Sequence, residues 1–170
     1  MKRKFWSVRK SITLSKKIEK IGENAFYNCD SLQSIEIPKS LKDVYATYDS
    51  IDTPNGVFNE CSRLKTIVFE KGSTIIADAL FRGCDGLESI VISDTITQIY
   101  GYAFADCKNL KNINISDSVT VLEENVFQND TSITEINLPD RTLTMEKTDG
   151  EIAEDNLDWE KEADMDAALD

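Results

Sequence analysis

Residues 18–38, IEKIGENAFYNCDSLQSIEIP, decide the fold of this chain because their pattern returns along it. The closest copies are ITQIYGYAFADCKNLKNINIS at 96–116 and VTVLEENVFQNDTSITEINLP at 119–139. Looser copies surround two further phenylalanines. The repeated phenylalanines, spaced by 32, 23, 23 and 23 residues, are Phe26, Phe58, Phe81, Phe104 and Phe127. A unit of 23 residues is therefore repeated five times, and the first interval holds nine extra residues.

The end of each unit predicts a short β-strand. In the first copy, Ile35 and Ile37 alternate with Glu36, which is the period of a strand with one buried side. The earlier segment 24–29 places Ala25, Phe26 and Cys29 on one side, as in one or two turns of α- or 3₁₀-helix. One unit alone cannot bury this apolar side, so we predict a solenoid in which every unit packs on its neighbours.

The shared pattern, I-x-x-I-x-x-x-A/V-F-x-x-C-x-x-L-x-x-I-x-I-P/S, resembles the leucine-rich repeats of the BspA type over roughly residues 8–140. The resemblance implies an α/β solenoid. It would be a right-handed curved stack with short parallel strands on the concave face and short helices or turns on the convex face. Many members of that family are surface or secreted proteins with adhesive or protein-binding roles, and the family has no catalytic motif to transfer.

The repeat divides the chain into three parts. Residues 1–17 form a basic N-terminal half-repeat, 18–140 hold the five repeats with the extra residues within 45–56, and 141–170 form an acidic end. For this end we weigh a capping helix against a disordered tail. The net charge of −12 argues against nucleic acid or anionic lipid as a partner. The absence of a long apolar run predicts no transmembrane segment.

Four cysteines recur in register, each three residues after a repeat phenylalanine, and Asp130 takes their position in the fifth unit. They are Cys29, Cys61, Cys84 and Cys107. The sequence contains no C-x-x-C pair of the kind that binds zinc. Equivalent side chains in a parallel stack point the same way, which is poor geometry for a disulfide. We therefore predict buried free thiols. Free thiols and the lack of a signal peptide predict a cytoplasmic location for the chain as given, or the cell surface or exterior if it belongs to a longer precursor.

The residue content limits the possible chemistry. Histidine is absent, so Ser-His-Asp, Cys-His and H-E-x-x-H sites cannot form, and neither common phosphate-binding glycine motif occurs. A hydrolase that uses two carboxylates is the remaining enzyme hypothesis, but no acid pair stands out. We predict a protein that is not an enzyme and has no cofactor or metal site.

Two surfaces are candidates for binding a partner protein. The first is formed by residues that point outward from the predicted concave strands. These are Glu36, Thr66, Val68, Ser89, Val91, Asn112, Asn114, Glu135 and Asn137. Strand propensity alone also explains the two valines. The second surface is the insertion, with Tyr45, Tyr48, Asp49 and Asp52, although an insertion can also be merely tolerated. We expect a monomer that binds another protein. The alternative is an adhesion module for a host protein or glycan.

Overall fold

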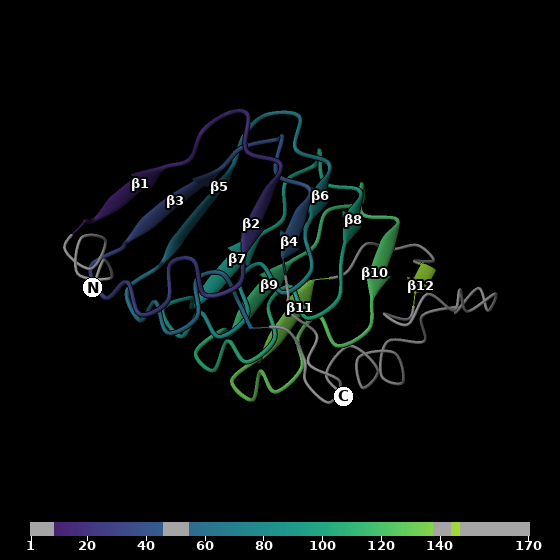
Figure 1. The fold of residues 1–170 in the computed structure, drawn as a ribbon. Helices are drawn as coiled ribbons and strands as arrows, with labels where there is room; N and C mark the ends of the chain where they lie inside the picture. The colour runs from purple at the N-terminus through teal and green to yellow at the C-terminus, as the bar shows by residue number, and fades with distance from the viewer. Residues whose placement is uncertain (1–8, 46–54, 138–143, 147–170) are drawn as a thin grey trace.

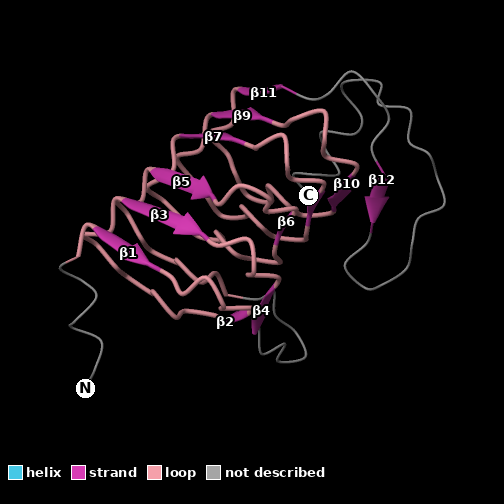
Figure 2. Ribbon diagram, turned by 90° about the horizontal axis from the view of Figure 1, so that it is seen from above, coloured by secondary structure: helices cyan, strands magenta, loops and turns pink. Residues whose placement is uncertain are grey.

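The computed structural model describes residues 9–45, 55–137 and 144–146, and it shows a β-solenoid of stacked coils (Figure 1). The coils contribute strands to two parallel ladders on opposite sides of the stack (Figure 2). The first ladder contains β1 (Ser11–Thr13), β3 (Ser34–Ile37), β5 (Thr66–Phe69), β7 (Ser89–Val91), β9 (Asn112–Asn114) and β11 (Glu135–Asn137). The second contains β2 (Lys20–Gly22), β4 (Asp43–Tyr45), β6 (Ile75–Ile76), β8 (Gln98–Ile99), β10 (Val121–Glu123) and β12 (Thr144–Glu146).

Equivalent residues of successive units pair with one another, so the sequence repeat becomes a structural register. Ile35 pairs with Ile12 on one side and with Ile67 on the other, and Ile113 is paired in the same way in the other half of the ladder. This stacking confirms the predicted solenoid of parallel strands. It also explains the strict frame, because shifting a strand by one residue would turn its apolar side chains toward solvent.

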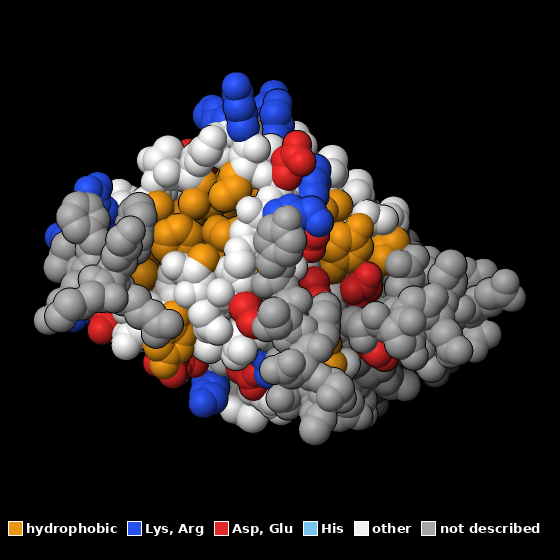
Figure 3. Space-filling view, viewed as in Figure 1, with side chains coloured by type: hydrophobic (Ala, Val, Ile, Leu, Met, Phe, Trp, Pro, Cys, Tyr) orange, Lys and Arg blue, Asp and Glu red, His pale blue; other side chains and the backbone are white. Residues whose placement is uncertain are grey.

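The core is a set of apolar rows along the stack. The five repeat phenylalanines are buried, and their rings stack at centroid distances of 5.3, 5.7, 5.5 and 5.9 Å in chain order. The leucines that follow them, from Leu32 to Leu110, are fully buried. At the N-terminal end of the stack, apolar side chains reach the surface (Figure 3), and Leu14 and Ile18 pack there partly buried against the core.

Of the short helices or turns predicted for the convex face, the helices are wrong, because the described residues contain turns in their place and no helix. Four of the five units have two residues in the left-handed region, four positions apart, and the second unit has one, at Glu60. No α-helix continues through such a residue. The other non-glycine residues with positive φ are Asn24, Asn28, Ala79, Tyr102, Asp106, Asn125 and Asn129, and Gly83 completes the pattern. Asparagine tolerates this conformation well, and it supplies four of these positions.

The second ladder was not predicted from the sequence. Its strands have only two or three residues, too short for an alternating pattern to be recognised. A signal nevertheless exists, because one buried apolar residue recurs in the same position of the units. This row is Ile21, Val44, Ile76, Ile99 and Leu122, and Leu122 pairs with Met145 of β12. Thr144–Glu146 thus extends the ladder beyond residue 140.

Both ladders are interrupted at one point, which we call the seam. The strand order is β1-β3-β5 and then β7-β9-β11 in the first ladder, and β2-β4 and then β6-β8-β10-β12 in the second. The described strands therefore do not pair across the seam, which lies between β5 and β7 and between β4 and β6. Phe69 takes the position of Ile37 and Ile92 there, and its ring packs edge-on against Phe81 at 6.2 Å. Aromatic packing thus replaces strand pairing at this point.

Turns and glycines hold the two sides of the seam together. The backbone N–H of Glu60 donates to the carbonyl of Gly83 at 3.0 Å. A Cβ on Gly56 would lie 2.0 Å from the carbonyl oxygen of Arg82, and one on Gly86 would lie 2.6 Å from the backbone nitrogen of Leu64. The coils are therefore in direct backbone contact on their turn side.

Candidate partner-binding face

The outward side of the first ladder is the candidate site, and we call it the ladder face. It carries two rows of side chains that follow the strand register. One row is Thr13, Glu36, Val68, Val91, Asn114 and Asn137, and the other is Ser11, Ser34, Thr66, Ser89 and Asn112. Ser34 is half-buried and the rest are exposed, because the apolar residues between them point into the core. The predicted face residues that can be described therefore lie on one surface.

The centre of the ladder face is apolar. Val68 is 50% exposed and Val91 is 72% exposed, and the only other exposed large hydrophobic among the described residues is Tyr27. The two valines are on β5 and β7, so they flank the seam. An apolar centre with a polar rim is the usual arrangement of a protein-binding surface.

Some predicted site residues cannot be placed on this face in detail. Tyr48, Asp49 and Asp52 lie outside the described residues. Tyr45 and Glu135 lie in β4 and β11, and only their backbone is described. Tyr45 therefore ends a strand of the second ladder, whereas Glu135 pairs with Asn112 in the first.

The cysteines belong to the core, as predicted. All four are free and buried, and three thiols donate to the carbonyl of a phenylalanine in the preceding coil: Cys61 to Phe26, Cys84 to Phe58 and Cys107 to Phe81. Burial raises the pKa of Cys61 to about 12 and raises the pKa of Cys84 and Cys107 well above the usual value. Because a nucleophilic cysteine needs its thiolate, these thiols are poor nucleophiles.

Asp130 interrupts this row with a buried carboxyl group. Its Oδ1 accepts a hydrogen bond of 2.7 Å from the backbone N–H of Cys107, while its Oδ2 is buried without a hydrogen-bond partner among the described residues. Burial raises the pKa of Asp130 to about 8. A raised carboxyl pKa can mark an active site, but here the group lies inside the stack and no second acid is paired with it by a described hydrogen bond.

One small pocket lies beside the ladder face. A pocket of about 20 Å³, lined by Thr13, Leu14, Lys16, Glu36, Pro38 and Glu70, has room for one water molecule. Lys16 and the backbone N–H of Lys39 both contact the Glu70 carboxylate, at 3.2 and 3.1 Å. The Lys39 N–H, and then Lys16, hold the pKa of Glu70 below its usual value. This carboxylate therefore ties neighbouring turns together.

The described residues lack two features, a cluster of metal ligands and a membrane-spanning helix. They contain no group of three His, Cys, Asp or Glu side chains that could hold a metal ion. They also form no helix of the length and apolarity needed to cross a membrane.

Stacked coils, a parallel ladder and repeated Leu and Phe positions in the core define a leucine-rich repeat solenoid. A comparison with protein families agrees. Six copies of the BspA type leucine rich repeat region match at residues 5–48 and 51–148. The chain belongs to the BspA-type leucine-rich repeat family. No curated protein shows a significant match to it.

Solved structures of similar proteins share the fold. A leucine rich cell surface protein from Faecalibacterium prausnitzii is 31% identical, with a TM-score of 0.59 over 76% of this chain and 32% of that one. A leucine-rich repeat protein from Bacteroides ovatus is 25% identical, with a TM-score of 0.57 over 80% and 34%. A leucine-rich repeat protein from T. pallidum, 19% identical, has a TM-score of 0.52 over 80% and 72%. The chain thus spans about a third of the first two proteins.

Proposed function

We propose that this chain is a non-enzymatic interaction module that presents the ladder face to a partner protein. The observation that carries the proposal is the pair of exposed valines, Val68 and Val91, on a surface whose other described positions are polar. The centres of protein interfaces are depleted of charged residues. Two apolar side chains on a rigid scaffold also lose little conformational entropy when a partner binds. The proposed contact residues are the ladder-face residues predicted from the sequence.

The insertion remains a second proposed contact region. Tyr45, Tyr48, Asp49 and Asp52 would add tyrosine side chains, which are favoured at binding hot spots, to a rigid support. A partner that uses both regions would reach around the coil from one ladder toward the other.

A pull-down with the intact chain as bait tests the proposal. Val68→Glu with Val91→Glu would place charge at the centre of the ladder face, and we expect it to abolish capture of a specific partner. Ser62→Glu with Thr131→Glu is the matched control, because both residues are exposed in turns and the added charge is equal. Tyr45→Ala with Tyr48→Ala tests the insertion. If neither the valine pair nor the tyrosine pair changes capture, both regions are excluded.

Adhesion at a cell surface is a second candidate function. It is favoured by the similarity to the leucine rich cell surface protein of F. prausnitzii. Antibody labelling of intact producing cells would test it, since an adhesin must be accessible from outside. Labelling that appears only after the cells are opened would contradict adhesion and leave the interaction module intact.

A further inference from the structure

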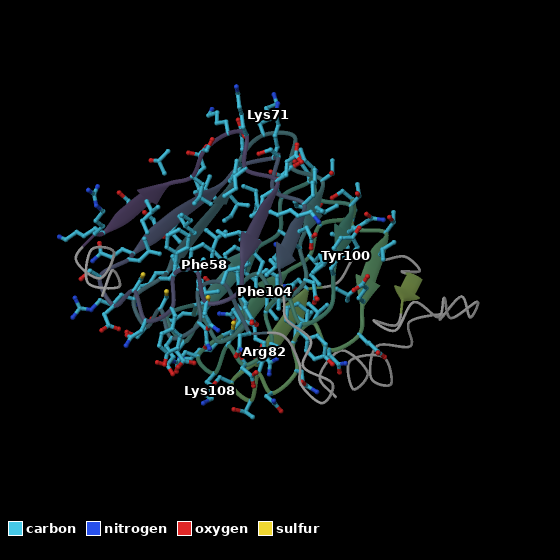
Figure 4. All side chains as sticks on the ribbon, in the orientation of Figure 1. Phe58, Lys71, Arg82, Tyr100, Phe104 and Lys108 are labelled. Carbon is cyan, nitrogen blue, oxygen red and sulfur yellow. The ribbon has the colours of Figure 1, made fainter. Side chains whose placement is uncertain are left out.

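The turn that follows each first-ladder strand carries a charge that changes sign halfway along the stack. The same position of the repeat holds lysine in three successive units and aspartate in the next two described ones. We call Lys16, Lys39 and Lys71 the lysine row and Asp94 and Asp117 the aspartate row. All five side chains are exposed, and Figure 4 shows Lys71 at the top of the view, where basic side chains gather in Figure 3.

The strand register keeps each row together in space. Ile37 pairs with Phe69, so Lys39 and Lys71 follow paired residues at equal distance, and the backbone bond from Glu70 N–H to Ile37 carbonyl continues this pairing. Val91 pairs with Asn114, and Asp94 and Asp117 follow them in the same way. Parallel strands lie about 4.8 Å apart, so the members of each row gather along one half of the edge, with the Glu70 carboxylate beside the lysines.

The sign changes at the seam, where the exposed valines lie. Lys71 and Val68 are on the β5 side, whereas Asp94 and Val91 are on the β7 side. None of Lys39, Lys71, Asp94 and Asp117 forms an ion pair with another described residue. Lys16 is paired with Glu70, so Lys39, Lys71 and the aspartate row are the charges available to groups outside the described part of the chain.

We propose that the ladder face binds a second copy of this chain in a two-fold symmetric, face-to-face dimer. The two-fold axis runs parallel to the strands and passes between the seams of the two copies. Rotation about this axis reverses the order of the coils along the stack. The strands of the two copies still run in the same direction, so the turns that follow the strands meet one another. Val68 then faces Val91 of the other copy, Lys71 faces Asp94, and Lys39 faces Asp117.

Self-complementarity favours a second copy over an unrelated partner. A two-fold interface requires a patch that maps onto itself. Here the apolar pair is symmetric about the seam, and the charge rows change sign about the same point. A different protein would need complementary charges, but it would not require the two features to share a centre. This inference rests on the proposed function of the ladder face and names its partner.

The size of the face predicts a weak dimer. Six short strands with spacings of about 4.8 Å extend about 24 Å along the stack, and a strand of three or four residues covers about 10–13 Å. The area per copy is therefore below the roughly 800 Å² of a standard stable interface. We expect association that depends on concentration, with the charge rows setting the register more than the affinity.

Sedimentation velocity and small-angle scattering over rising concentration test the dimer. A salt concentration of about 150 mM is suitable, because a Debye length of about 8 Å screens the repulsion expected from the net charge while close pairs persist. The acidic variant Lys39→Asp with Lys71→Asp and the basic variant Asp94→Lys with Asp117→Lys should each stay monomeric alone. In a dimer of the acidic variant every row contact joins Asp to Asp, and in a dimer of the basic variant every row contact joins Lys to Lys. Their equimolar mixture should dimerise, because every row contact between the two variants joins Asp to Lys, as in the wild type.

The chain that carries all four substitutions should dimerise again, since exchanging both rows restores the complementarity. Arg63→Asp with Lys108→Asp is the control, because these exposed turn residues give the same change in net charge as the acidic variant away from the rows. It should dimerise like the wild type. Far-ultraviolet circular dichroism checks that all variants are folded.

A wild-type chain that stays monomeric at millimolar concentration would overturn the proposal. So would a wild-type dimer whose acidic and basic variants also dimerise alone, since the contact would then lie on another face. If the wild type is monomeric but still captures a different protein through Val68 and Val91, this inference fails while the proposed function stands. If the wild type dimerises through the rows but captures nothing else, the second copy is the partner.

Discussion

The two halves of the solenoid differ in the regularity of their repeat. On the β7 side of the seam, coils of 23 residues are joined by ladders from β7 to β11 and from β6 to β12. On the β1 side, ladders from β1 to β5 and from β2 to β4 join the coils, but one interval has 32 residues, and strand pairing stops between the halves. The phenylalanine stack nevertheless crosses the seam at 5.7 Å, close to its spacing elsewhere. Side-chain packing and turn contacts can thus continue a solenoid where strand pairing stops.

The largest effect tests whether the core is continuous at the seam. Phe81 stacks between Phe58 and Phe104, and Phe104 stacks between Phe81 and Phe127 in the regular half. We expect Phe81→Ala and Phe104→Ala each to lower the free energy of unfolding by about 3–5 kcal/mol, since both rings are fully buried. Urea denaturation measures both. A much smaller loss for Phe81→Ala would mean that the seam divides the core.

The next effect tests the backbone contact at the seam. Gly56→Ala places a methyl group against the carbonyl of Arg82, so we expect a loss of about 2–3 kcal/mol in the free energy of unfolding. Gly22→Ala is the control, because a Cβ at that position would have no other atom within 4 Å and the φ of Gly22 is not positive. It should be close to neutral in the same denaturation experiment. Equal stability of the two variants would show that the coils at the seam can separate without cost.

The repeated frame is the part of the fold that could be predicted most fully from the sequence. Five phenylalanines in one frame specify a stack of parallel units, and the position of Glu36 between two isoleucines specifies which side faces outward. The cysteines were assigned to the core because they share that frame. These predictions hold because equivalent positions of a repeat lie in the same environment, so each unit supplies independent evidence for it.

The seam and the turns could not be predicted in this way. Strand pairing stops where the Phe69 ring packs against Phe81, and that contact joins residues of different units. Left-handed residues replaced the predicted helices at positions such as Ala79 and Tyr102, whose side chains do not indicate that conformation. The roles of the predicted contact residues stay predictions, because binding also depends on the partner.

The third effect concerns Asp130, which takes the cysteine position in the fifth unit. Asp130→Cys would replace a buried carboxyl group with the thiol found in the other units, whose thiols donate to phenylalanine carbonyls. The substitution removes the buried Oδ2, which has no hydrogen-bond partner among the described residues, but it also removes the hydrogen bond from Cys107 N–H to Oδ1. We expect the first effect to exceed the second, so that the free energy of unfolding at neutral pH rises by about 1–2 kcal/mol. Asp117→Ser, at an exposed position, is the control and should change little.

The pH dependence of this difference has a defined sign. The pKa of Asp130 is about 8 in the folded chain and 3.8 ordinarily, so folding favours the protonated form. The contribution of this group to stability is complete below pH 3.8 and is lost as the pH rises through about 8. The advantage of Asp130→Cys over the wild type should therefore grow across this range in thermal unfolding. An advantage that shrinks with rising pH would contradict the protonated assignment.

The smallest effect compares an ion pair at the seam with one in the regular half. Lys65 and Glu88 bridge the seam, but their side chains are 63% and 61% exposed. A double-mutant cycle with alanine should give a coupling near zero, since solvent screens exposed pairs. Arg82 and Asp106 lie across the next contact, are 18% and 26% exposed, and are joined by a bond of 2.8 Å.

The Arg82–Asp106 pair should therefore show a larger coupling, up to about 1 kcal/mol. The Arg82 guanidinium also lies 5.6 Å from the centre of the Tyr102 ring, and Asn129 donates to the other oxygen of Asp106 at 2.9 Å, so both partners are held in place. Equal couplings for the two pairs would mean that the exposed bridge supports the seam after all. A larger coupling only for Arg82–Asp106 would mean that the exposed ion pair does not stabilise the seam. The phenylalanine stack and the glycine contacts would then be the interactions that connect the coils where strand pairing is missing.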